Sequence, residues 1–317
     1  MRLVNGWQVV DGHADILYRM GKEALSFDDA NSPLQQGALR LERSGVDVQV
    51  FATFIEPHLT PCEQLYRVFA SLYRFRREIE AQGVWKAVTS VAEMDERLRQ
   101  EGKCAFLSLE GADALNGEIA VLDALFRAGV RWLGLTWNGA NCLADGVGEE
   151  RGAGLTEFGK EVIVEMQRLG MVVDVSHLAW RGVEDVLQRS NRPVVASHSN
   201  AHAVFPHRRN LPDELLQGIA ASGGTVGMTF VPQFVGYRDH LAVDDLLPHI
   251  EHLLRVAGVD GVAFGSDFDG IEETLVDLRS GEDYPQFVDR LIKEFGEQTA
   301  RKMAGENLLR VLRTTLP

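Results

Sequence analysis

The sequence predicts an α/β fold, specifically a single (β/α)₈ barrel of the TIM type. Three observations support this prediction. Short apolar runs alternate with segments of helical periodicity, the runs number about eight, and 317 residues suit one barrel with insertions. No Ser/Gly linker, charge block or repeat divides the chain. We therefore expect residues 1–317 to form one domain, with any active site at the carboxyl ends of the strands.

The predicted strands are apolar along nearly their whole length. This pattern is expected of parallel strands that are covered by helices on one face and packed inside a barrel on the other. The runs lie near Gln8–Gly12, Val46–Phe54, Cys104–Leu109, Trp132–Thr136, Met171–Val175, Val194–Ser197, Thr225–Phe230 and Gly261–Gly265.

The segments between these runs repeat Leu, Val and Ile at helical spacing. Helices are expected over Cys62–Gln82, Ala120–Ala128, Thr156–Leu169, Trp180–Ser190, Pro212–Ala221, Val243–Ala257, Tyr284–Phe295 and Glu306–Arg313. Two long segments are rich in Gly or polar residues, namely Asn141–Gly154 and Val231–His240. We expect both to be loops over a site, because functional loops in barrels are often long.

Composition excludes several classes of protein. Hydrophobic residues make up 45% and charged residues 25% of the chain, which argues against a disordered or fibrous protein. The net charge of −14 argues against a nucleic-acid partner. The 3 cysteines have no CxxC spacing, so neither a disulfide framework nor a thiolate zinc site is predicted. Without a signal-like start or a long apolar stretch, the sequence predicts a cytoplasmic protein with no membrane anchor.

Metal-binding residue types recur where the predicted strands end. They are His13 and Asp15 in DGHAD, Glu110 in LEGAD, His177 in DVSH, His198 in ASH and Asp267 in FGSDFDG. The carboxyl ends of barrel strands are the face on which barrel enzymes carry their chemistry. Three histidines, one glutamate and two aspartates can bind two adjacent cations through a bridging carboxylate, and one carboxylate is left for proton transfer.

Each short motif also has an ordinary structural explanation. HxD alone is more often a solvated loop, or a helix cap at Asp15, and a lone histidine is usually a hydrogen-bonded structural residue. Other catalytic patterns are absent, because the sequence has neither HExxH nor GxSxG. The convergence of all six residues on one barrel face favours the metal site.

These motifs occur in the same order as RRNLPDE and GENLLRVL, and together they resemble the renal (membrane) dipeptidase family of zinc peptidases across essentially the whole chain. The resemblance implies two zinc ions, for which manganese or cobalt can substitute. It implies the following roles: His13 and Asp15 bind one ion, His177 and His198 bind the other, Glu110 bridges them, and Asp267 transfers a proton. A hydroxide held between the ions would attack the peptide carbonyl.

The resemblance also implies the substrate, a dipeptide, including dipeptides with a D-residue at the carboxyl end. Arg209 would bind the terminal carboxylate through its guanidinium fork. The family tends toward homodimers. Its best-known members have LTH where this chain has Leu135, Thr136 and Trp137, with Asn138 next, so the donor to the substrate carbonyl is open. Asn138 or Asn141 could supply it, while Trp137 could line the pocket.

Two other functions stay open from the sequence. One is a different binuclear amidohydrolase that acts on N-acyl amino acids or lactones. The other is a metal-binding barrel without catalysis, since a fold alone does not imply a reaction.

Overall fold

Eight parallel strands close into a barrel in the computed structural model, which describes residues 6–317. The ring strands are β1 (Val9–Ala14), β2 (Val46–Phe54), β4 (Lys103–Glu110), β5 (Val130–Gly134), β6 (Val172–Asp174), β7 (Val194–Ala196), β8 (Thr225–Met228) and β9 (Val262–Phe264). β9 pairs with β1, and β2 pairs with β4, so the ring is complete. The predicted (β/α)₈ barrel is confirmed, and each predicted strand overlaps a ring strand.

One strand was not predicted. β3 (Trp85–Ala87) pairs with the first residues of β4, through Trp85 opposite Lys103, and it is not part of the ring. With 3 residues, one of them the exposed Lys86, it lacks the apolar run that marked the other strands. The first strand also extends further than predicted, so His13 lies within β1 and not after it.

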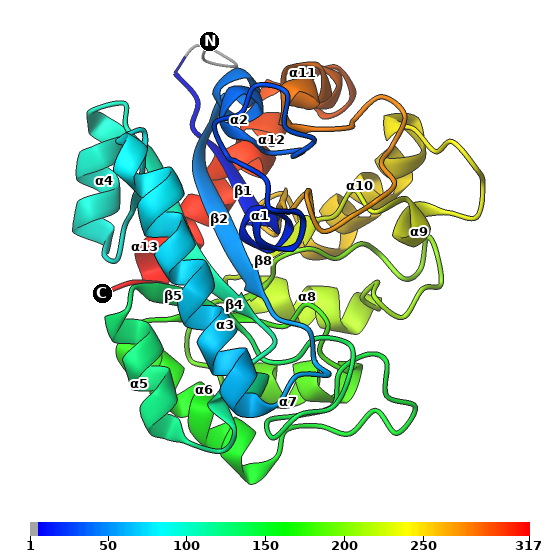
Figure 1. Cartoon of the computed structure of the whole chain (residues 1–317). Coiled ribbons are helices and arrows are strands. Elements are labelled where there is room, and N and C mark those ends of the chain that lie inside the picture. The colour runs from blue at the N-terminus through cyan, green and yellow to red at the C-terminus, as the bar shows by residue number, and fades with distance from the viewer. Residues whose placement is uncertain (1–5) are drawn as a thin grey trace.

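Helices surround the strands (Figure 1). Those that match predicted helices are α3 (Pro61–Arg74), α5 (Ile119–Arg127), α6 (Glu157–Leu169), α7 (Trp180–Arg189), α8 (Asp213–Ala221), α10 (Val243–Ala257), α11 (Tyr284–Phe295) and α13 (Asn307–Thr315). The sequence analysis missed α1 (Ile16–Glu23), α2 (Ala38–Ser44), α4 (Val91–Arg99), α9 (Pro232–Val235) and α12 (Glu297–Arg301). Short π and 3₁₀ turns complete the set: η1 (Phe75–Ile79), η2 (Glu80–Gln82), η3 (Asp113–Leu115), η4 (Gly281–Asp283) and η5 (Lys302–Glu306).

The barrel interior and the helix layer form two apolar clusters. The inner cluster includes Val10, Val48, Phe106 and Trp132, whose side chains are all nearly or completely buried. Residues of α13 belong to the same cluster, among them Leu308. The outer cluster packs the helices against the other face of the strands, as the alternation of side chains along a strand requires.

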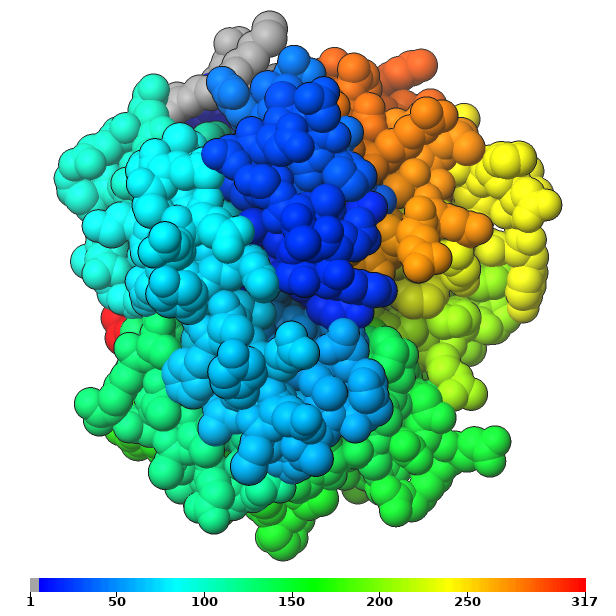
Figure 2. Space-filling model, in the orientation of Figure 1, coloured from blue at the N-terminus to red at the C-terminus, as the bar shows by residue number. Residues whose placement is uncertain are grey.

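The helix α13 closes the amino end of the barrel. Arg310 of α13 donates hydrogen bonds to the carbonyl oxygens of Gly223 and Asp260, which precede β8 and β9. At the opposite end of the barrel, the strands finish and continue into loops that carry polar residues. Figure 2 shows the dark blue segment that follows β1 beside the orange segment that follows β9. The backbone N–H groups of Gln35 and Gln36 donate to the Asp269 carboxylate, which joins these two segments.

Candidate metal centre

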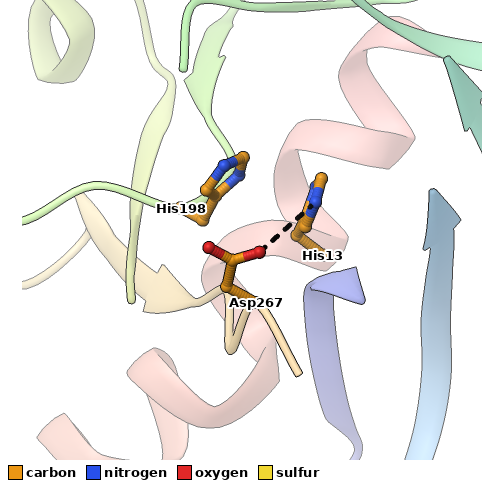
Figure 3. Close-up of side chains that lie close together, drawn as sticks. All are labelled: His13, His198 and Asp267. Carbon is orange, nitrogen blue, oxygen red and sulfur yellow. Dashed lines mark ion pairs between the residues drawn. The ribbon is translucent and has the colours of Figure 1, made fainter. Parts of the chain in front are cut away.

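Six predicted residues converge at the carboxyl end of the barrel. His13 lies in β1 and Glu110 ends β4. The other four lie one to three residues after the ends of β1, β6, β7 and β9, and they are Asp15, His177, His198 and Asp267. They form three groups, in each of which one possible ligand atom per residue lies within 4.8 Å of the others: His13 with Asp15 and Glu110, Glu110 with His177 and His198, and His13 with His198 and Asp267. In Figure 3 the side chains of the last group point toward one another.

Glu110 lies between two sets of potential ligands. Its Oε2 is 3.4 Å from His13 Nε2, whereas its Oε1 is 2.9 Å from His177 Nε2 and 3.7 Å from His198 Nε2. Burial opposes ionisation of this carboxyl, but the nearby imidazole of His13 outweighs it and lowers the Glu110 pKa. An ionised carboxylate with one oxygen toward each set is the arrangement that a bridging ligand requires.

The imidazole of His177 directs a lone pair toward its neighbours. His177 Nδ1 lies 2.9 Å from Asn138 Oδ1, an oxygen that only accepts, so the proton is on Nδ1 and Nε2 is bare. That Nε2 lies 2.9 Å from both His198 Nε2 and Glu110 Oε1. Burial, with a further contribution from Arg209, lowers the pKa of His177 to about 4. Burial and then the neighbouring His13 lower the pKa of His198 well below its usual value.

His177 Nε2 and the ionised Glu110 Oε1 both present lone pairs, and no proton lies between them. A bound cation removes this repulsion, and imidazole with carboxylate is a ligand set that suits zinc. The donor chemistry therefore fits a metal ion.

His13 and Asp15 make up the other half of the site. His13 Nε2 lies 3.2 Å from Asp15 Oδ2, and Asp15 Oδ1 is buried without a hydrogen-bond partner among the described residues. Burial lowers the His13 pKa, but the carboxylates of Glu110 and Asp15 outweigh burial and raise it. Gly270 faces these groups, and a Cβ there would lie 2.3 Å from Asp15 Oδ2. The close approach of the backbone requires glycine.

Asp267 lies at the mouth of the same cluster. Its Oδ1 is 3.9 Å from His13 Nε2, the interaction dashed in Figure 3. Burial raises the Asp267 pKa well above its usual value; Asp15 and Glu110 add to the effect, and His13 and Arg209 oppose it. A carboxyl that readily accepts a proton beside potential metal ligands suits general acid and base chemistry.

A pocket of about 700 Å³ opens over the cluster. Arg209 lines it and is buried, with Nη2 3.0 Å from the carbonyl oxygen of His198 and no hydrogen-bond partner for Nε among the described residues. Burial lowers the Arg209 pKa, although Asp267 and Glu110 partly offset this effect. A buried guanidinium with a free donor is suited to an anionic group of a ligand.

Trp137 and Asn138 both line the pocket, as the sequence analysis anticipated for the segment after β5. Trp137 packs against Phe54 at a tilt, with ring centroids 5.1 Å apart, and Phe54 in turn contacts Tyr18. Asn138 Oδ1 contacts His177 Nδ1, so the oxygen of this amide is already used. The Nδ2 of Asn141 donates to Asp113 and to the carbonyl of Leu135, and Asn141 is not among the lining residues.

The sequence analysis missed several lining residues, including Tyr18, Phe54 and Phe234. Phe234 falls within Val231–His240, a segment that was predicted to cover the site. The sequence did not indicate that this side chain lines the pocket. Phe234 stacks on His207 with ring centroids 4.5 Å apart and lies 5.4 Å from the Arg209 guanidinium carbon. Phe54 and Tyr18 could not be recognised because an isolated aromatic residue is most often part of a core.

A family model described as membrane dipeptidase, peptidase family M19, matches residues 1–316. The chain belongs to the membrane dipeptidase family. An uncharacterized dipeptidase of Schizosaccharomyces pombe is 32% identical to it, over 97% of this chain and 80% of that protein.

Solved structures agree with this assignment. The metallopeptidase dipeptidase AC has a TM-score of 0.91 and 27% identity, over 98% of this chain and 99% of its own. A metallopeptidase from Rhodobacter sphaeroides, liganded with a phosphinate mimic of the dipeptide L-Ala-D-Ala, has a TM-score of 0.90 and 26% identity, over 98% and 100% of the two chains. This member of the membrane dipeptidase family is therefore a hydrolytic metallopeptidase. Among residues 6–317, no helix is long and apolar enough to cross a membrane.

Proposed function

We propose that this chain hydrolyses dipeptides, including L-Xaa-D-Xaa dipeptides, with the aid of two zinc ions. His13 and Asp15 would bind one ion, His177 and His198 the other, and Glu110 would bridge them. The observation that supports this best is the position of Glu110, whose two carboxylate oxygens face different sets of ligands. Manganese or cobalt can take the place of zinc, because the ligand set does not exclude them.

Bound ions of this kind polarise a carbonyl group and lower the pKa of a water molecule. The chain itself supplies proton transfer. Asp267, whose pKa is raised, would accept a proton from the attacking water at a carboxylate oxygen and deliver it to the leaving amine. No serine or cysteine nucleophile is needed.

Arg209 would orient the substrate by binding its terminal carboxylate. Its side chain is held by the His198 carbonyl and the Phe234 ring, while Nε has no partner among residues 6–317. Two parallel N–H donors read a carboxylate with defined geometry, so a substrate must present this group at a fixed distance from the metal ligands. This restriction supports dipeptides as substrates.

Trp137 and Asn138 would complete the substrate site in different ways. Trp137, with Phe54 and Tyr18, would form an aromatic wall beside the metal ligands. Asn138 would contact the substrate through its Nδ2 while its Oδ1 fixes the His177 tautomer. The homodimer and the cytoplasmic location stay predictions.

The first experiment combines metal analysis with hydrolysis of L-Ala-L-Ala, L-Ala-D-Ala and their terminally blocked forms, before and after chelation. We expect about two ions per chain and chelator-sensitive cleavage of the unblocked dipeptides only. Cleavage of N-acyl amino acids or lactones in preference to dipeptides would assign a different amidohydrolase activity. Two ions without turnover of any of these compounds would indicate a metal-binding barrel without catalysis.

A further inference from the structure

Two buried aspartates outside the proposed ligand set support its two halves in the same way. Asp11 is fully buried in β1, and Asp174, the last residue of β6, is 4% exposed. Each accepts backbone N–H groups from the ends of two neighbouring ring strands. We propose that Asp11 and Asp174 are positioning residues. Asp174 would hold the proposed ligands His177 and His198, and Asp11 would hold the proposed ligand His13 beside Asp267.

Asp174 joins the ends of β6 and β7. Its Oδ1 accepts the N–H groups of Ser176, at 2.9 Å, and Ser197, at 3.0 Å. These serines directly precede His177 and His198. A second bridge runs between the same segments, because the His198 N–H donates to Ser176 Oγ at 3.0 Å.

Asp11 makes the corresponding contacts between β1 and β9. Its Oδ1 accepts the N–H groups of His13, at 3.2 Å, and Ser266, at 3.0 Å. Ser266 directly precedes Asp267, and its hydroxyl donates to Asp11 Oδ2 at 2.7 Å. The Asp267 N–H in turn donates to the carbonyl of His13, so this half is also bridged twice.

Backbone strain explains why each half needs such an anchor. His177 and Asp267 both have a φ of 67°, in the left-handed region that non-glycine residues rarely adopt. That conformation is unfavourable for a residue with a Cβ. In both halves the strained residue follows the serine whose N–H is bound by the buried aspartate. These buried hydrogen bonds help to hold the backbone in the strained conformation.

The two halves have separate anchors. Asp174 Oδ2 accepts a hydrogen bond from the indole N–H of Trp132, at 3.1 Å. Asp11 Oδ2 instead accepts hydrogen bonds from the hydroxyl of Tyr284, at 2.8 Å, and from the side-chain amide of Gln36. No hydrogen bond among residues 6–317 joins the two aspartates through a common donor. Loss of one aspartate should therefore weaken one ion and spare the other.

The test measures Co²⁺ affinity by calorimetric titration in two backgrounds, and it depends on the metal ligands given under Proposed function. In the His13→Ala background, only the ion held by His177 and His198 should bind. In that background, Asp174→Ala should lower Co²⁺ affinity about 10- to 100-fold, while Asp11→Ala should have little effect. In the His198→Ala background, Asp11→Ala should lower Co²⁺ affinity about 10- to 100-fold, while Asp174→Ala should have little effect.

Asp47→Ala is the matched control. Asp47 is also a buried barrel aspartate that binds a backbone N–H, that of Val9, but it lies at the amino ends of β1 and β2. It should change stability without changing Co²⁺ affinity in either background. The variants Asp11→Asn and Asp174→Asn keep an acceptor oxygen, so they should show the same selectivity with a smaller loss, and they serve if an alanine variant does not fold.

The outcomes separate the two proposals. Wild-type chain that binds fewer than two Co²⁺ ions would overturn the binuclear centre, and the anchors with it. Two Co²⁺ ions in the wild type would keep the binuclear centre. The anchors alone would be overturned if Asp11→Ala and Asp174→Ala weakened both ions equally, or if they weakened Co²⁺ binding no more than Asp47→Ala does.

Discussion

The pH dependence of stability should contain a distinct contribution from His249, a fully buried residue of α10. Its Nδ1 accepts the N–H of Ala201 at 3.2 Å, and its Nε2–H donates to the carbonyl of Val235 at 3.2 Å. The neutral ring satisfies both groups, whereas a second proton on Nδ1 would face the Ala201 N–H. Burial lowers the pKa of His249 from 6.5 to about 4.

The sign and size of the effect follow from this pKa. The unfolded chain binds the proton more tightly than the folded chain, so the stabilisation is complete above pH 6.5 and is lost as pH falls toward 4. At about 1.4 kcal/mol per pH unit, the full interval corresponds to about 3 kcal/mol. Between pH 7 and pH 5 the expected loss is about 2 kcal/mol.

The assay is urea unfolding of chelator-treated wild type and His249→Gln at pH 7 and at pH 5. Glutamine retains a donor and an acceptor but does not titrate. The variant should be less stable than wild type at pH 7, and this difference should shrink by about 2 kcal/mol at pH 5. Other titrating groups cancel in the comparison. An equal loss of stability in both proteins between the two pH values would refute the reasoning.

Three further predictions concern the metal centre and the pocket. Asp267→Asn should lower kcat about 10²- to 10⁴-fold with metal content unchanged, measured by steady-state kinetics and metal analysis; metal loss would instead make Asp267 a ligand. Arg209→Ala should lower kcat/KM for dipeptides about 10²-fold or more and have little effect on their C-terminal amides, and equal damage to both would remove Arg209 from carboxylate recognition. Gly270→Ala should weaken Co²⁺ binding in titrations, because its Cβ would lie 2.3 Å from Asp15 Oδ2; unchanged affinity would contradict this steric argument.

The barrel could be predicted because its ring strands are continuous apolar runs. The short elements could not. β3 has 3 residues, and α1 begins at Ile16 without a side-chain cap and contains Gly21. For α4 a signal existed, since the Ser90 hydroxyl accepts the Glu93 N–H at its start, but the helix has few apolar positions to support it.

The clustering of the candidate ligands could be predicted because each lies at or just beyond the end of an apolar run. Their supports could not, since nothing near Asp11 in the sequence indicates a partner 255 positions away at Ser266. In the sequence, Asp174 is likewise a charged residue within an apolar run. Its contact with the end of β7 is evident only in the folded structure. Long-range hydrogen bonds carry no periodicity, so residues that act through them are invisible to pattern analysis.

The pairing of β1 with β9 has a consequence for biosynthesis. His13 is synthesised long before Asp267, yet the two side chains meet in one cluster. Of the two proposed ions, the one held by Glu110, His177 and His198 needs residues that follow β6 and β7, so a nascent chain that has made only its first half cannot capture it. Uptake of that ion should therefore follow formation of β7, and its binding energy then favours more completely folded chains over partly folded ones.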